Sequence, residues 1–152
     1  MILFDTNILV HTHAVRSPFH VVAKRLRDHA AAGDIQACFS PQILCEFYAV
    51  TTNPRLFQPA LTPQQASREV GRYWTQSAFQ KILPMADTIP RLLKLMERHS
   101  RSQQDLFDSF LVATMQDNDV RTIYTQNAKD FEFYHEIKVI NPLVVDEVAR
   151  HG

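Results

Sequence analysis

Short apolar runs alternate with segments of helical spacing along almost the whole chain, and this alternation is the feature that most restricts the fold. The runs cover residues 2–4, 35–39, 81–83, 121–124 and 137–140. Short apolar runs bounded by turn signals are typical of buried strands, and helical crossovers between them permit parallel pairing. The pattern predicts a single three-layer α/β/α domain over residues 1–152, with a central, mostly parallel sheet.

Capping signals indicate where the helices begin and end. We expect helices from Phe19 to Ala32, between Ser40-Pro41 and Asn53-Pro54, from a capping box at Thr62 to about Trp74, from Asp87-Thr88 through Met96, and from Leu106 to Met115. Ser17 and Pro18 are expected to provide the cap and the first-turn proline of the first of these helices. The tripeptide Asp5-Thr6-Asn7 is expected to be a loop after the first strand.

Composition excludes several classes of function. Lys plus Arg and Asp plus Glu both number 16, so no net field favours a polyanionic partner, and nucleic-acid binding must rely on local patches. The chain has 3 glycines and neither a Walker-type loop nor a dinucleotide fingerprint. Its 2 cysteines lack metal-type spacing, and it shows no membrane-length apolar run and no signal peptide. We therefore expect a reduced, cytoplasmic protein that does not enter a membrane.

Candidate ligands for a divalent metal ion occur where strands end and inside apolar helices. Asp5 directly follows the first apolar run, and Asn127 follows a late one. Glu46 and Asp108 lie among apolar residues, where a carboxylate is costly unless it is paired or binds a metal. Taken singly, an acid in a first helical turn is usually a cap or dipole contact. Together, the carboxylates suit hard ions such as Mg²⁺.

The residues around these acids resemble the PIN-domain ribonucleases, especially the VapC-like toxins of bacterial toxin-antitoxin pairs. The resemblance runs nearly end to end and rests on the segments 3–7, 43–47, 107–114 and 123–131, which read LFDTN, ILCEF, FDSFLVAT and IYTQNAKDF. It implies that Asp5, Glu46 and Asp108 hold Mg²⁺, with Mn²⁺ as a possible substitute. Family members often have a fourth acid where this chain has Asn127, and some instead have an acid three residues later, where Asp130 stands.

The fourth position of the site stays open at this point. Asn127 is the preferred candidate, Asp130 could instead orient its neighbours, and Asp105 lies one helical turn before Asp108, where facing the helix dipole is the simpler role. The resemblance further implies a metal-dependent endoribonuclease whose products carry a 5′-phosphate and a 3′-hydroxyl. It also implies a cognate antitoxin that blocks the acidic pocket, and a homodimer.

Two other groups of side chains could contact RNA. The first comprises His11, His13, His20 and His29 with Arg16, Lys24, Arg25 and Arg27. Its spacings match no zinc site, and its cations suggest a solvated face that could touch phosphates. The second comprises Tyr73, Trp74 and Phe79, which could stack on bases, although such residues are more often core or oligomer contacts. Thr6 and Thr125 could support the ligands or simply cap turns.

Two alternative functions remain. A HAD-like phosphatase also begins with an apolar strand ending in Asp, but that family needs a second Asp where Asn7 stands, and without it the leaving group has no proton donor. A catalytically inactive PIN-fold module that binds RNA or protein would not need Asp5, Glu46 and Asp108 together. Hydrolysis of RNA at a carboxylate-held metal is therefore the favoured hypothesis.

Overall fold

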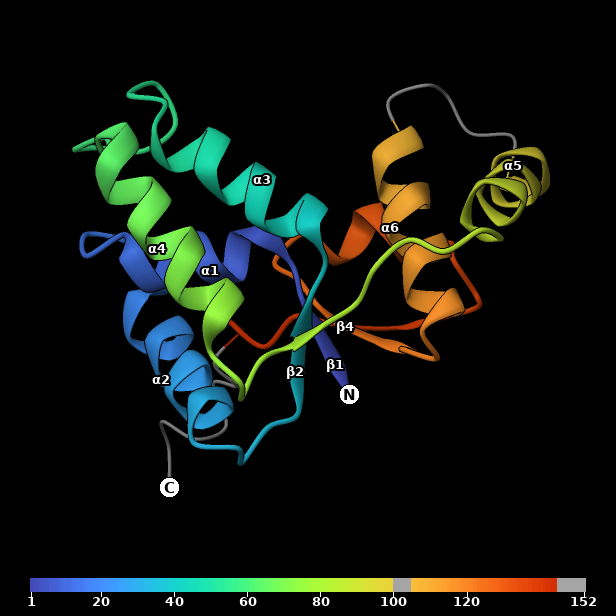
Figure 1. Ribbon diagram of the computed structural model, residues 1–152, viewed down its shortest axis with the longest axis horizontal. Coiled ribbons are helices and arrows are strands. Elements are labelled where there is room, and N and C mark those ends of the chain that lie inside the picture. Colours follow the sequence, from blue (N-terminus) through green and yellow to red (C-terminus); the bar gives the residue numbers. More distant parts are fainter. Residues whose placement is uncertain (100–104, 145–152) are drawn as a thin grey trace.

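The computed structural model describes residues 1–99 and 105–144, which form a parallel sheet between two layers of helices (Figure 1). In chain order the elements are β1 (Ile2–Phe4), α1 (Thr6–His13), α2 (His20–Ala31), β2 (Ala37–Phe39), α3 (Pro41–Thr51), α4 (Pro63–Thr75), β3 (Gln80–Lys81), α5 (Thr88–His99), α6 (Leu106–Asp117), β4 (Thr122–Tyr124), the short 3-10 helix η2 (Ala128–Asp130) and β5 (Lys138–Ile140). The α/β fold class expected from the alternating pattern is confirmed.

The strand order indicates which part of the sheet is best placed to bind a ligand. The sheet has 5 strands in the order β3-β2-β1-β4-β5, and every neighbouring pair is parallel. From β1 the chain moves outward through β2 to β3, and then returns to the other side of β1 to form β4. The direction of the connections thus reverses between β1 and β4. In open parallel sheets, ligands bind at the carboxyl ends of the strands that flank such a reversal.

The two layers of helices follow from the same reversal. Crossovers between parallel strands are right-handed, so connections that run in opposite directions place their helices on opposite faces of the sheet. Helices α1 to α4 accordingly lie on one side of the sheet, and α5 and α6 lie on the other (Figure 1). A sheet covered on both faces requires apolar strands. Leu3, Phe4, Cys38, Phe39 and Ile123 are completely buried, as this arrangement demands.

The segment after β1 differs from the expectation. Asp5-Thr6-Asn7 is not a loop, because α1 begins at Thr6 and Asp5 is its N-cap. The buried side chains of α1 include Ile8, Leu9 and Thr12, which have helical spacing. This helix was missed because its polar start resembles a turn and its three apolar residues, Ile8, Leu9 and Val10, are consecutive.

The caps expected for α3 and α4 are confirmed, and the one expected for α2 is wrong. Thr62 and Gln65 form the reciprocal capping box of α4. The Ser40 hydroxyl accepts a hydrogen bond from the Ile43 amide at the start of α3. Ser17, however, does not cap α2, whose N-cap is Phe19. Its hydroxyl instead accepts a hydrogen bond from the Phe19 amide and lies 2.8 Å from His11 Nδ1.

The aromatic residues of α4 and the following segment pack mainly in the core. Tyr73 is 4% exposed and Phe79 is 1% exposed, so neither can stack on a base, whereas Trp74 is 38% exposed with the Lys81 ammonium over its ring. Cys38 and Cys45 are both free. Across the described residues, none of the helices has the length and hydropathy to cross a membrane.

Candidate active site

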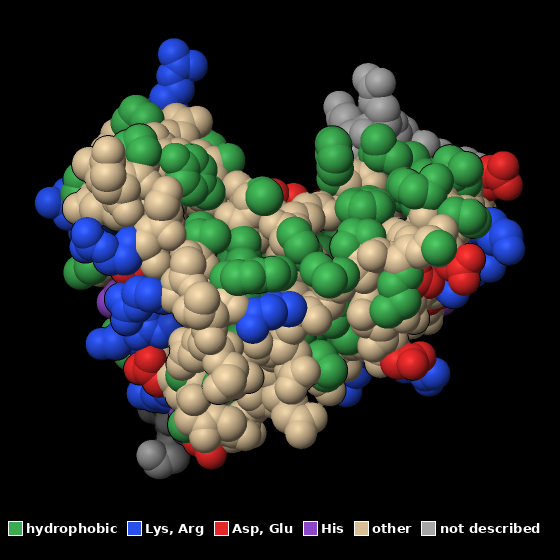
Figure 2. Space-filling model, in the orientation of Figure 1, with side chains coloured by type: hydrophobic (Ala, Val, Ile, Leu, Met, Phe, Trp, Pro, Cys, Tyr) green, Lys and Arg blue, Asp and Glu red, His purple; other side chains and the backbone are tan. Residues whose placement is uncertain are grey.

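The acids singled out in the sequence meet at the carboxyl ends of β1 and β4. Asp5, Glu46, Asp108 and Asn127 all line one cavity of about 350 Å³, together with Asp130. They reach it from different elements: Asp5 follows β1, Glu46 lies in α3, Asp108 lies in α6, and Asn127 precedes η2. The surface is notched between the lobe that carries α3 and α4 and the lobe that carries α5 and α6, and acidic side chains are visible in the notch (Figure 2).

Asp5 is the most constrained of these acids. It is 7% exposed, and its Oδ1 accepts a hydrogen bond from the Thr6 amide at 2.8 Å. Its Oδ2 accepts hydrogen bonds from the Thr125 hydroxyl at 2.7 Å and from Asn7 Nδ2 at 3.2 Å. Burial raises the pKa of Asp5, and the negative charge of Glu46 raises it further, while these three hydrogen bonds oppose the rise. The donors therefore orient a carboxylate that burial penalises.

Glu46 is held by one donor on each carboxylate oxygen. The Thr6 hydroxyl donates to Oε2 at 2.6 Å, and Gln42 Nε2 donates to Oε1 at 3.0 Å. Gln42 Nε2 also donates a hydrogen bond, at 3.0 Å, to the backbone carbonyl of Phe107, which is the residue before Asp108. The Glu46 carboxylate and the Phe107 carbonyl can only accept hydrogen bonds, so the Gln42 side chain must turn its NH₂ group, and not its oxygen, toward them. Gln42 thus ties Glu46 on α3 to the first turn of α6.

Asp108 differs from the other two acids in having no hydrogen-bond donor in the described part of the chain. Its pKa is raised from 3.8 to about 7, first by burial and then by the negative charges of Asp5, Asp130, Glu46 and Asp105. A carboxylate that is partly buried beside other carboxylates favours its protonated form. The negative charge of the cavity is therefore concentrated and only partly compensated by the protein around Asp108.

The three candidates for the fourth position have different placements. Asn127 is exposed and lines the cavity, and its amide donates to the Thr125 hydroxyl at 3.0 Å. Asp130 is exposed and also lines the cavity. Asp105 is the N-cap of α6 and is not among the residues that line the cavity, although its charge contributes to the raised pKa of Asp108. The structure thus brings Asn127 and Asp130, but not Asp105, to the wall of the cavity.

A line of hydrogen bonds behind Asp5 was missed in the sequence. Asn7, which donates to Asp5, accepts a hydrogen bond from the Gln126 amide at 2.9 Å, and the Gln126 side-chain oxygen lies 2.7 Å from His11 Nε2. The other ring nitrogen of His11 lies 2.8 Å from the Ser17 hydroxyl. Asn7 and His11 are four residues apart on α1, so recognising that helix would have placed them on one face.

The donor set suits a hard divalent cation, although its carboxylates do not converge on one point. Three carboxylates and an amide offer oxygen ligands of the kind that Mg²⁺ and Mn²⁺ prefer. Over residues 1–99 and 105–144, no three His, Cys, Asp or Glu side chains lie close enough together to hold a metal ion. Asp5 and Glu46 are each held by protein donors, whereas the carboxylate of Asp108 has none among the residues that the structure describes. The residues of the cavity therefore suit a divalent metal ion by the chemistry of their oxygen ligands and by the negative charge of their carboxylates.

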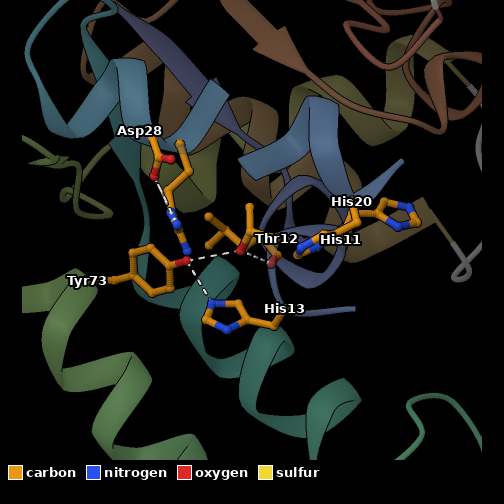
Figure 3. A network of polar contacts seen from close by, with 8 residues as sticks. His11, Thr12, His13, His20, Asp28 and Tyr73 are labelled. Carbon is orange, nitrogen blue, oxygen red and sulfur yellow. Dashed lines mark hydrogen bonds and ion pairs between the residues drawn. The ribbon is translucent and has the colours of Figure 1, made fainter. Parts of the chain in front are cut away.

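The histidines of the N-terminal segment do not form one solvated face. The Tyr73 hydroxyl lies 2.9 Å from His13 Nε2 and 3.2 Å from the Thr12 hydroxyl, which ties α1 to α4 (Figure 3). Burial lowers the pKa of His13, so this side chain favours its neutral form. His11 lines the acid cavity. The expectation of a solvated face is therefore wrong for His11 and His13 and holds for exposed His29.

The structure defines an open parallel α/β fold with an acid cavity at the reversal point of its sheet, and comparison with known proteins specifies the family. The family model described as "PIN domain" matches residues 2–136. The chain belongs to the PIN-domain family, as its motifs suggested. The HAD-like alternative loses its basis, and the Asn7 amide occupies the place of the required acid as a donor to Asp5.

Relatives with assigned names are similar along almost their full length. Ribonuclease VapC48 of Mycobacterium tuberculosis is 24% identical over 139 residues, which are 91% of this chain and 95% of the relative. Among solved structures, the Mycobacterium tuberculosis toxin VapC20, described as cleaving the sarcin-ricin loop, is 17% identical with a TM-score of 0.66, covering 91% of this chain and 99% of its own. A toxin-antitoxin complex from Klebsiella pneumoniae is 23% identical with a TM-score of 0.61, covering 93% and 98%. Because these solved structures are less than 25% identical to this chain, their similarity establishes the fold alone.

Proposed function

We propose that this protein is a metal-dependent endoribonuclease that acts as the toxin of a toxin-antitoxin pair. The observation that carries the proposal is the meeting of Asp5, Glu46 and Asp108, from three separate elements, in one cavity at the reversal point of the sheet. Support comes from the PIN-domain match and from the name of the ribonuclease relative.

The residues of the cavity would divide the work of hydrolysis. Asp5, Glu46 and Asp108 would hold Mg²⁺, or Mn²⁺ in its place. When bound, such an ion supplies charge neutralisation at the phosphate and activation of water. Thr125, Asn7 and Thr6 fix the Asp5 carboxylate, and Gln42 fixes Glu46, so that both are oriented before substrate arrives. Asn127 presents a neutral amide at the exposed rim, where it can contact the substrate phosphate.

The reaction is hydrolysis of one phosphodiester bond. Water adds to phosphorus as the bond from phosphorus to the 3′-oxygen breaks, one proton of the water passes to that oxygen, and the products carry a 5′-phosphate and a 3′-hydroxyl. Preorganised charge at the phosphate, in a cavity partly shielded from solvent, is the main contribution expected from the protein. The neutral replacement of a carboxylate should therefore abolish the reaction.

Direct incubation of the protein with single-stranded and structured RNAs in Mg²⁺ or Mn²⁺ tests this function. Wild-type protein should cleave RNA, and Asp5→Asn and Asp108→Asn should each reduce the rate by at least about 100-fold. Asp87→Asn is a matched control, because it removes an exposed acid that does not line the cavity. Cleavage that persists in both cavity variants would remove the mechanism. Binding of RNA without turnover under any metal would favour the inactive module.

We also propose two protein partners, a cognate antitoxin and a second copy of the chain. One of the similar solved structures is described as a toxin-antitoxin complex, which supports the first. Co-purification with the product of a small adjacent gene would test the antitoxin, and sedimentation of the pure protein would test the homodimer. The reduced state expected of Cys38 and Cys45 fits a cytoplasmic location.

A further inference from the structure

Two histidines connect the acid cavity to a second hollow on the outer face of α2. His11 lines the acid cavity, and His20 Nδ1 lies 3.0 Å from the His11 carbonyl oxygen. His20 also lines an open hollow formed by α2 and the turn that follows it. Among the described residues, the two hollows share no lining residue, and the contact between His11 and His20 is what joins their walls.

The cations on α2 differ in how far they are neutralised. Arg27 pairs with Asp28 at 2.9 Å, and His29 lies 3.0 Å from Asp34. Lys24 and Arg25 are exposed and line the hollow, and neither has an acidic partner within residues 1–99 and 105–144. Asp28 and Asp34 also line the hollow, but each is already paired, so Lys24 and Arg25 are the cations of this hollow without an ion-pair partner among the described residues.

The arrangement of charge fits a polyanion that extends out of the acid cavity. The cavity itself is lined by Asp5, Glu46, Asp108 and Asp130, so it cannot attract a nucleic acid without help. Affinity for nucleic acid comes mainly from Lys and Arg contacts with phosphates. Lys24 and Arg25, on the hollow that His20 lines, supply such cations.

We propose that the face of α2 is a track for single-stranded RNA, in which a strand leaves the acid cavity over His11 and His20 and places neighbouring phosphates on Lys24 and Arg25. This inference rests on the proposed function, because it concerns the path of the same substrate. An RNA occupant fits better than a protein partner, since Val21 is the one large apolar side chain among the described residues that line the hollow. The core of a protein interface is depleted of charge.

The double variant Lys24→Ala, Arg25→Ala tests the track. Both side chains are exposed on a helix, where alanine is well tolerated. Arg121→Ala, Lys138→Ala is the matched control, because it removes two exposed cations from the amino ends of β4 and β5, at the opposite edge of the sheet. The first readout is the affinity for a fluorescently labelled single-stranded RNA 12-mer in EDTA, measured by anisotropy over a range of salt concentrations.

The expected loss follows from the release of counterions. Each phosphate contact on single-stranded nucleic acid contributes a slope of about −0.7 to log K against log salt, so two lost contacts reduce its magnitude by about 1.4 and weaken binding by roughly 25-fold near 0.1 M salt. The second readout is the ratio of kcat/KM for the 12-mer to that for a dinucleotide, in Mg²⁺. This ratio should fall by a similar factor in the α2 variant and stay at the wild-type value in the control.

The possible failures point to different parts of the reasoning. If the α2 variant binds RNA with the wild-type slope, or the control loses as much affinity, the track is wrong while the nuclease stands. If the α2 variant loses binding but wild-type protein cleaves no RNA in any metal, the proposed catalysis is wrong while the track stands. A variant that changes only the affinity for a protein partner also overturns the track.

Discussion

Replacing Asp108 with asparagine should stabilise the metal-free protein at alkaline pH while it abolishes activity. The carboxylate of Asp108 is partly buried, has no donor among the described residues, and lies near other acids that raise its pKa from 3.8 to about 7. A raised pKa means that the folded state favours the protonated form. The stability from this group is therefore complete below about pH 4 and is lost as the pH rises through about 7.

The size of the effect can be worked from the same pKa. The interval between 3.8 and about 7, at about 1.36 kcal/mol for each pH unit, gives about 4 kcal/mol as an upper limit. Because Asp108 is partly open to solvent, which screens its interactions, about 1–2 kcal/mol is the realistic expectation. For a domain of this length, that corresponds to a rise in Tm of roughly 2–8 °C.

Urea unfolding in EDTA, followed by circular dichroism at pH 4 to 8, measures this effect. Asp108→Asn should be more stable than wild type at pH 8, and the difference should shrink steadily toward pH 4. The slope m should be unchanged, since the fold is the same. The difference in stability between Asp87→Asn and wild type should not change with pH in this way. Equal stabilities at pH 8, or a gap that widens as the pH falls, would refute the electrostatic account of this site.

Adding Mg²⁺ should close most of the gap in stability between wild-type protein and Asp108→Asn at pH 8. An ion at ten times its Kd stabilises the folded state by about 1.4 kcal/mol, because it binds the native cavity and not the unfolded chain. Wild-type protein at pH 8 should gain this stability, whereas Asp108→Asn should gain much less. An equal gain in both proteins would mean that the ion binds elsewhere.

Three further substitutions separate the orientation of the acids from the stability of the fold. Gln42→Leu removes the donor that holds Glu46, and the Mg²⁺ concentration for half-maximal RNA cleavage should rise about 10- to 100-fold; an unchanged value would show that Gln42 is only a packing residue. Thr125→Val removes the hydroxyl that donates to Asp5 and should lower kcat/KM about 10- to 100-fold. Thr125→Ser keeps a hydroxyl and should restore kcat/KM, and failure of this rescue would count against a role for the hydrogen bond. Tyr73→Phe removes a hydroxyl shared by two α1 side chains and should cost about 1–2 kcal/mol in urea unfolding while RNA cleavage stays at the wild-type rate; an activity loss without destabilisation would contradict this separation.

The sheet and most of the helices could be predicted because local signals and the global fold agree. Apart from β3, whose two residues Gln80 and Lys81 are exposed, the strands are short and mainly apolar. The capping box at Thr62 and the Ser40-Pro41 signal each mark a real helix start. Strand ends were less certain: the run 35–39 contains the strand Ala37–Phe39, and 81–83 lies partly beyond Gln80–Lys81. In the latter case the Ile82 amide still donates to the Phe39 carbonyl, so pairing continues past the strand.

The membership of the cavity could be predicted, but the support of its acids could not. Asp5, Glu46 and Asp108 stand out in the sequence because a carboxylate at a strand end or among apolar residues needs an explanation. Thr125 and Gln126 depend on a contact between segments more than 100 residues apart, which no local pattern encodes. Gln42 was within reach, since it lies four residues before Glu46 on the same helix.

The zero net charge of the chain hides a separation of charge that the fold creates. Sixteen acidic and sixteen basic side chains cancel in composition, which argues against a partner attracted by the whole molecule. The fold places four acids around one cavity, and among the described residues it leaves Lys24 and Arg25 without an ion-pair partner on the hollow that His20 lines. Acids without cations nearby would repel RNA, and cations without acids would bind RNA without a site for a metal. The neighbouring placement of both is what a nuclease requires, and it lowers the stability of the metal-free fold at high pH because Asp108 must stay charged there.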